Sequence, residues 1–254
     1  MKFKYSYKQV QKAKGKYQSF ANRILLEKIF DPLTWLVANF TNLTPNMLSY
    51  IGFAFGFLGA FVFIKTNFLL GAICWELSNL FDTFDGRIAR LKGKKDRNFR
   101  FGEYIDVYGG YWVLFALIFG LSLGLYFEYG SIILLVIGFL LYFFMTVHFT
   151  EGLLVRSLIG KDKAKYEEKV VSYKEKGGIL AKLFDFQRKI SKKYGLEEPF
   201  NLTDMEHLML FVIPMVSVLV KPIFFEGMVI AIVCLALHSL MWFLNYRRML
   251  KYPA

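Results

Sequence analysis

The chain has 254 residues, of which 56% are hydrophobic and 19% aromatic, and its formal net charge at pH 7 is +12. This composition is too apolar for an ordinary soluble domain and indicates a polytopic, all-α membrane protein. Basic loops on one side of a membrane account for the positive charge, so no nucleic-acid partner is expected. The two cysteines, Cys74 and Cys234, lie in apolar runs and are interpreted as core residues, which excludes a disulfide framework.

Residues 1–31 are rich in lysine and predict an amphipathic helix on the cytoplasmic surface of the membrane. In this interpretation the lysines meet anionic headgroups. A set of apolar residues would lie against lipid: Tyr5, Val10, Tyr17, Phe20, Ile24 and Leu25. A solvated tail is the alternative. The segment lacks the short apolar run and cleavage site of a signal peptide.

The remaining residues, 32–254, predict a single domain of six transmembrane helices, because a span needs about 20 mostly apolar residues. Thr44 and Pro45 predict the start of the first span as N-cap and first helical residue. The six runs are 45–64, 68 into the aspartate motif, 103–125, 131–150, 205–220 and 223–244. A charged linker covers about 156–200.

Charge asymmetry sets the orientation of these spans. One set of connections carries only Lys65, Glu128, Lys221 and Glu226, which is sparse and balanced. The other set carries the basic N-terminus, the loop "LKGKKDRNFR", the linker and the basic C-terminus. We therefore expect both termini and the polar end of the second span to face the cytoplasm.

Three aspartates lie where the second and third spans meet the cytoplasm. Helical periodicity places one set of residues from the second span on one face, with Arg90 at its edge: Asn79, Asp82, Asp85, Gly86 and Ala89. On the third span Gly102, Asp106 and Gly110 share a face. The short connection predicts that these two helices are antiparallel neighbours, so that Asp82, Asp85 and Asp106 converge.

Three converging carboxylates repel one another unless a cation joins them. Oxygen ligands suit a hard ion such as Mg²⁺, Mn²⁺ or Ca²⁺, and the motif has no histidine or cysteine for zinc. Gly86 and Ala89 leave space for a ligand, and Arg90 can pair with a phosphate. The residues thus predict a metal-assisted site for a phosphate or pyrophosphate compound. The alternative is that the aspartates cap helix ends and pair with nearby lysines and Arg100.

The pattern Asp82-x-x-Asp85-Gly86-x-x-Ala89-Arg90 followed by Gly102-x-x-x-Asp106 resembles the signature of the CDP-alcohol phosphotransferases. The opening of the first span, "LTPNMLSYIG", and the layout of six spans are also similar to that family. The resemblance covers the chain from about residue 31 through the third span, whereas the last three spans match only in number.

The resemblance implies an integral membrane enzyme of phospholipid or glycolipid synthesis, with membrane lipids around it and a homodimeric assembly. It would move a phosphoalcohol group from a CDP-linked donor to an acceptor alcohol and release CMP. By analogy Asp82, Asp85 and Asp106 bind two ions of Mg²⁺ or Mn²⁺. The donor would contact a larger set: Asn46, Asn79, Asp82, Gly86, Ala89, Arg90 and Gly102.

One position departs from the family pattern, which has a fourth aspartate where this chain has Gly110. That aspartate is assigned as the general base, and glycine cannot accept a proton. Glu103 or Tyr108 could stand in, although Tyr108 lies off the aspartate face. Otherwise the acceptor is acidic enough to need no strong base, the sequence carries an inactivating substitution, or the chain is an inactive relative that only binds nucleotide. The connection from Arg90 to Gly102 is also longer than the family usually has.

Other polar residues in the apolar runs have two interpretations each. Glu76 either bonds across the bundle or packs with Asn79 and Ser78. His148 and Glu151 could contact the acceptor headgroup or simply lie at the membrane interface. His207 is a weaker candidate for the same contact. A cation transporter would place acidic residues near mid-membrane in several spans, whereas here all except Glu76 cluster at one rim.

Overall fold

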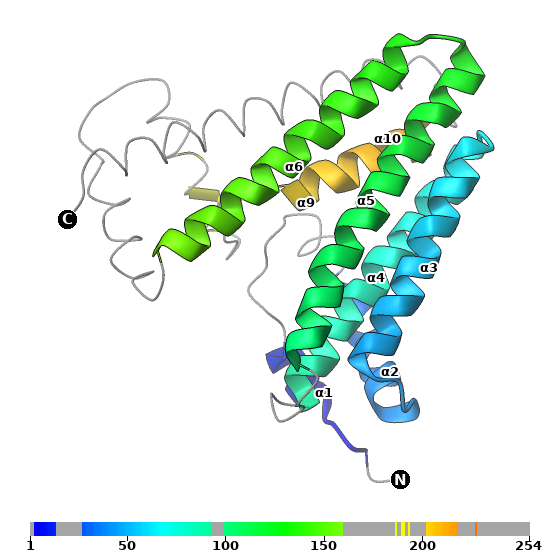
Figure 1. Ribbon diagram of the computed structural model, residues 1–254. Coiled ribbons are helices and arrows are strands. Elements are labelled where there is room, and N and C mark those ends of the chain that lie inside the picture. The colour runs from blue at the N-terminus through cyan, green and yellow to red at the C-terminus, as the bar shows by residue number, and fades with distance from the viewer. Residues whose placement is uncertain are drawn as a thin grey trace.

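The computed structural model describes residues 3–13, 27–92, 99–159 and 202–217, together with positions 186, 189, 190, 193 and 227. All regular structure in these residues is helical, as the sequence predicts. Three long helices, α3, α4 and α5, stand side by side, and α6 leaves the far end of α5 at an angle to them (Figure 1).

Helix α3 spans Pro45–Ile64, with the predicted start and end. The Thr44 side chain accepts a hydrogen bond from the backbone N–H of Met47 at 3.3 Å, so the predicted N-cap is confirmed. Helix α4 spans Phe68–Lys92 and therefore carries the first two aspartates within one continuous helix.

Helix α5 spans Phe99–Tyr129 and begins four residues before the predicted start at Glu103. Helix α6 spans Ile133–Ile159, which is longer than the predicted run of 131–150. Gly130 joins them with φ of 67°, a left-handed conformation that glycine adopts without steric cost.

Two helical segments among the described residues are long and apolar enough to cross a membrane, namely Pro45–Ile64 and Val107–Tyr129. The apolar part of α6, Ile133–Val147, is shorter. The predicted sixth span lies outside the described residues except for Gly227, and so does most of the linker. Six spans therefore stay a prediction.

Helix α3 packs closely against both α4 and α5, whereas α4 and α5 barely touch one another. The prediction that α4 and α5 are direct neighbours was therefore wrong. The reason is a stripe of glycines on α3. A Cβ added at Gly59 would lie 3.1 Å from Cys74 Cβ of α4 and 3.2 Å from Leu117 Cδ2 of α5. Small residues let helix backbones approach, so α3 sits between its neighbours.

The main core lies deeper along the bundle, away from the aspartates. It joins α5 and α6 to a helical segment made of α9 (Leu202–His207), the π-helix η2 (Leu208–Val212) and α10 (Ile213–Ser217). Leu117, Leu121 and Met209 in this core are fully buried. The segment matches the start of the predicted fifth span, and η2 packs on both α4 and α5.

The N-terminal segment is helical only in part within the described residues. Helix α1 spans Tyr7–Lys12 and helix α2 spans Glu27–Phe40, while residues 14–26 lie outside the described ones. Val10 was expected to face lipid, but it has no exposed surface because α1 packs against α2 and α4. Val10 is thus covered by protein, whereas Tyr7 of the same helix is exposed.

Candidate functional site

The polar ends of three helices meet at one end of the bundle: the start of α3, the end of α4 and the start of α5 (Figure 1). Helix α3 contacts both α4 and α5. Its side chains therefore set the relative height, along the bundle axis, of the motif residues on α4 and those on α5.

Asp85 is held against α3 by a buried hydrogen bond. The carboxylate is 6% exposed, and its Oδ2 accepts from the Ser49 hydroxyl at 2.5 Å. Ser49 Oγ also lies 3.2 Å from the Pro45 carbonyl oxygen, one turn earlier. Asp82, one turn before Asp85 on α4, is exposed. Ser49 was not among the predicted site residues, although it lies in the "LTPNMLSYIG" stretch.

Asn46 meets Gly102 one turn before Ser49. A Cβ added at Gly102 would lie only 2.8 Å from Asn46 Oδ1, so the absence of a side chain makes room for the amide. Two predicted donor contacts, one from α3 and one from α5, are therefore adjacent. Further along, Gly109 lies against Phe53 of α3. Asp106 lies between Gly102 and Gly109 on α5, and Ser49 lies between their contacts Asn46 and Phe53 on α3. The backbone of Asp106 is therefore at about the same height in the bundle as Ser49 and its partner Asp85.

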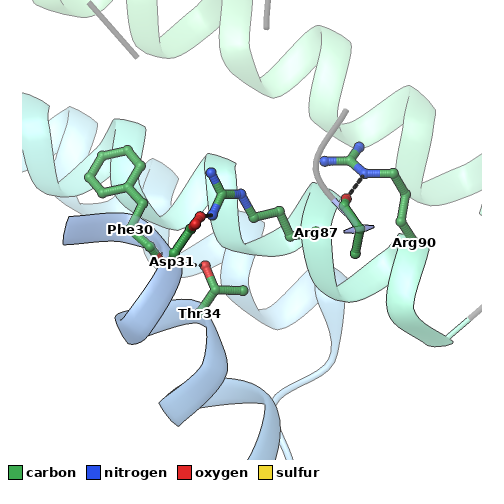
Figure 2. A network of polar contacts seen from close by, with 6 residues as sticks. Phe30, Asp31, Thr34, Arg87 and Arg90 are labelled. Carbon is green, nitrogen blue, oxygen red and sulfur yellow. Dashed lines mark hydrogen bonds and ion pairs between the residues drawn. The ribbon is translucent and has the colours of Figure 1, made fainter. Parts of the chain in front are cut away.

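The Arg90 guanidinium folds back along its own helix over Gly86. A Cβ at Gly86 would lie 3.3 Å from Arg90 Nη1 and 3.5 Å from Nη2. Arg90 Nε donates to the Ala13 carbonyl oxygen at 2.6 Å, which links α4 to the end of α1 (Figure 2). Loss of hydration lowers the pKa of Arg90 and the nearby charge of Arg87 lowers it further, while Asp85 opposes the shift.

A buried ion pair supports the motif from the side of α2. Arg87 Nη1 lies 2.6 Å from Asp31 Oδ1, and the two residues are 5% and 3% exposed (Figure 2). The fully buried Thr34 donates its hydroxyl to the Phe30 carbonyl in the same helix at 2.6 Å. Sequence reasoning missed this pair, because Arg87 occupies an unspecified position of the motif and Asp31 lies 56 residues away.

A second polar group lies deeper, between α4 and α9. Asn79 Nδ2 lies 3.5 Å from Glu76 Oε1 and 3.3 Å from Nε2 of the buried His207. An amide has two hydrogens, so Asn79 can donate to both when His207 carries its own hydrogen on Nδ1. Trp75 packs edge-on against the imidazole at 4.8 Å between ring centroids. Glu76 therefore bonds Asn79 of its own helix, as in the second interpretation, and it is Asn79 that reaches across to His207 of α9.

We expect His207→Leu to lower the free energy of unfolding by about 1–3 kcal/mol, because the partly buried Asn79 amide would lose an acceptor. Denaturant titration in detergent measures the change. The double variant Asn79→Leu/His207→Leu serves as the control and should regain part of the loss, because no amide donor is then left without its acceptor. Equal stability of His207→Leu and the parent chain would contradict this account.

The sequence also matches a known family over the segment that builds this site. Residues 42–167 match the family model described as CDP-alcohol phosphatidyltransferase. The chain belongs to the CDP-alcohol phosphatidyltransferase family. The matched segment begins just before α3 and includes α4 and α5, so it contains every aspartate of the motif.

The fold of this family member is similar to a solved structure. That structure is titled as Mycobacterium tuberculosis phosphatidylinositol phosphate synthase (PgsA1) with CDP-DAG bound. The sequences are 18% identical, the TM-score is 0.57, and the match covers 85% of this chain and 92% of that one. No curated protein matches the chain in sequence.

The position of the fourth aspartate in the CDP-alcohol phosphatidyltransferase pattern is open in this structure. Gly110 is exposed, and a Cβ added there would meet no heavy atom of the described residues within 4 Å. Tyr108, one of the considered substitutes, is 53% exposed and lies on Tyr104 with 4.3 Å between ring centroids. The side chain of Glu103 lies outside the described ones.

The described residues fit a hard divalent ion in their chemistry. Asp82 and Asp85 offer only oxygen, and the hydroxyl of Ser49 orients the buried carboxylate. No cluster of three potential metal ligands occurs among the side chains that the structure describes, but that of Asp106 is not one of them. The backbone of Asp106 lies at the level where a third carboxylate is needed.

Proposed function

We propose that the chain is a membrane CDP-alcohol phosphotransferase of phospholipid or related glycolipid synthesis. It transfers a phosphoalcohol group from a CDP-linked donor to an acceptor alcohol and releases CMP. Family membership supports this class of reaction. The similar fold of PgsA1, whose structure is titled with CDP-DAG bound, supports a CDP-linked donor.

The observation that carries the proposal is that α3 contacts motif residues of both α4 and α5. Ser49 bonds Asp85 of α4, and one turn earlier Asn46 lies against Gly102 of α5. Helices α4 and α5 each carry half of the motif and have little contact with one another. Their contacts with α3 hold the two halves at the same height in the bundle. A random set of helix-capping aspartates would not need this arrangement.

The carboxylates of Asp82, Asp85 and Asp106 would hold two ions of Mg²⁺ or Mn²⁺. Such ions neutralise charge on a diphosphate and on the departing CMP. The other residues would bind and orient the donor. Gly86, Ala89 and Gly102 would let it approach the backbone, and Asn46, Asn79 and Arg90 would contact it with polar groups. Asn79 would contact the donor from the side of α9, because its amide nitrogen is directed at His207 of that helix.

The proton of the acceptor hydroxyl needs a destination. Gly110 offers none, so either Glu103 takes the proton or an acidic acceptor loses it without help. The absence of a carboxylate at Gly110 also favours a second candidate function, a family member that binds a CDP-alcohol and metal without turnover.

We further propose that the protein is a multi-pass membrane protein with both termini and the site on the cytoplasmic side. Residues 1–31 would form a juxtamembrane segment and 32–254 the catalytic domain, surrounded by membrane lipids and assembled as a homodimer. The two long apolar helices support the membrane assignment.

The deciding experiment measures CMP formation by the purified protein with CDP-alcohol donors and Mn²⁺, with and without chelator. We expect metal-dependent CMP formation that is lost in Asp82→Ala, Asp85→Ala and Asp106→Ala. Ser131→Ala, a change at the opposite end of the bundle, is the matched control and should leave the rate unchanged. Binding of donor by the parent chain without CMP formation would favour the second candidate, and no binding would reject both.

A further inference from the structure

The N-terminal residues 3–13, here called the strap, are fixed across the end of the bundle that carries the motif. The backbone N–H of Tyr5 donates to Asn39 Oδ1 at 2.8 Å, and its carbonyl accepts from Trp35 Nε1 at 3.0 Å and Asn39 Nδ2 at 3.1 Å. The Phe3 ring packs on Trp35 with 4.9 Å between centroids. The first half of the strap is therefore tied to α2.

The second half of the strap is tied to α4. Ser6 and Gln9 form a reciprocal capping box that starts α1. At the other end of α1, the Ala13 carbonyl accepts from Arg90 Nε at 2.6 Å. The strap thus reaches a residue of the motif although it lies outside the segment 42–167 that defines the family.

A pocket of about 270 Å³ lies between the strap and the end of α4. Its described lining combines backbone, polar and basic groups: Tyr5, Gln9, Lys12, Ala13, Arg90 and Leu91. None of these residues is acidic. Neither Lys12 nor Arg90 forms an ion pair with another described residue within 4.0 Å. Two cations thus line one small pocket whose described lining has no acidic residue, and the one carboxylate that acts on Arg90, that of Asp85, lies outside this lining.

Like charges in one pocket repel each other, and an anion removes that cost. The Nε–H of Arg90 donates to the Ala13 carbonyl of the strap, and its two Nη groups lie beside Gly86. A guanidinium together with an ammonium group matches the several oxygens of a phosphate better than a single carboxylate. The amide of Gln9 and the strap backbone supply further polar surface.

We propose that this strap pocket is a binding site for a phosphate group, held by Lys12 of the strap and Arg90 of the motif. The phosphate belongs either to a cytidine nucleotide or to an anionic lipid headgroup. The inference rests on the proposed function only for the choice of nucleotide, since the pocket itself requires no turnover.

The test is binding by the purified full-length protein in detergent, measured by calorimetry without metal. Three probes separate the sources: inorganic phosphate, CMP and dihexanoyl phosphatidylglycerol. We expect Lys12→Ala to weaken phosphate binding about tenfold, the loss typical of one hydrogen bond to a charged group. Lys12→Arg should keep most of the affinity. Lys8→Ala, an exposed lysine of the same helix that does not line the pocket, is the matched control.

Loss of CMP affinity in Lys12→Ala but not in Lys8→Ala identifies the nucleotide as the source. Loss of phosphatidylglycerol affinity alone identifies the lipid headgroup. Equal affinities of the two variants for all three probes would overturn the proposal. Since no metal or transfer is involved, a failure of CMP formation under the proposed function would not affect this result. Unchanged thermal unfolding of both variants confirms that the strap still folds.

Discussion

Replacing Asp31 by alanine is expected to lower the free energy of unfolding by about 3–5 kcal/mol, the usual cost of leaving one member of a buried ion pair alone. The Arg87 guanidinium is 5% exposed and lies 2.6 Å from Asp31 Oδ1. Without the carboxylate its charge stays buried among α2 and α4. Denaturant titration of the protein in detergent measures the loss.

The double variant Asp31→Leu/Arg87→Met is the control for this prediction. Replacing both members of a buried pair by apolar residues is often neutral or stabilising, so the double variant should be much more stable than Asp31→Ala. Asp31→Ala and the double variant being equally unstable would mean that packing, and not the unpaired charge, sets the cost.

The ion pair also matters for the site, because Arg87 is a neighbour of Asp85 and Gly86 in the motif. Asp85 and Arg87 point to different partners, Ser49 on α3 and Asp31 on α2. The turn of α4 that carries the motif is therefore held on two sides. We infer that this support keeps the carboxylates in place when a charged ligand enters or leaves.

Local signals in the sequence predicted the start of α3 and the helical structure of the segment that carries Asp82 and Asp85. Thr44 and Pro45 act within one turn, so their effect does not depend on the rest of the fold. The contact of Asn46 with Gly102 agrees with the prediction that both belong to one site. The roles of these residues in binding stay predictions.

Contacts between distant segments could not be predicted in the same way. The pair of Asp31 and Arg87 joins charged residues that are usually exposed, and nothing in their local sequence distinguishes them from surface charges. The arrangement of α3 between α4 and α5 depends on how glycines on several helices meet. A short connection between α4 and α5 suggested direct contact, but close packing on α3 outweighed it.

The position of the strap could not be predicted from local sequence either. A basic, partly apolar N-terminus is typical of a segment that lies on a membrane. Tyr5 instead uses its backbone to bond α2, and Val10 is fully buried. Hydrogen-bond partners such as Asn39 and Trp35 are unremarkable in sequence, so docking on protein could not be told from docking on lipid.

Restoring an acidic side chain at position 110 is expected to raise the rate of CMP release by about 10²–10⁴-fold, the usual contribution of general acid–base catalysis. The side chain has room, since a Cβ at Gly110 meets no described heavy atom within 4 Å. Aspartate in place of glycine in a helix also costs no helix propensity. Gly110→Asp should therefore fold normally and add a proton acceptor one turn from Asp106.

The measurement is the initial rate of CMP release from CDP-diacylglycerol with Mn²⁺ and a panel of polyol and polyol-phosphate acceptors. Gly110→Asn is the matched control, because it has the same shape but cannot accept the proton. A higher rate in Gly110→Asp alone means that donor, metal and acceptor sites are intact and that this chain lacks only the base. Equal rates of the two variants, with donor bound by both, would mean that a group such as Glu103 already takes the proton or that more than the base is missing.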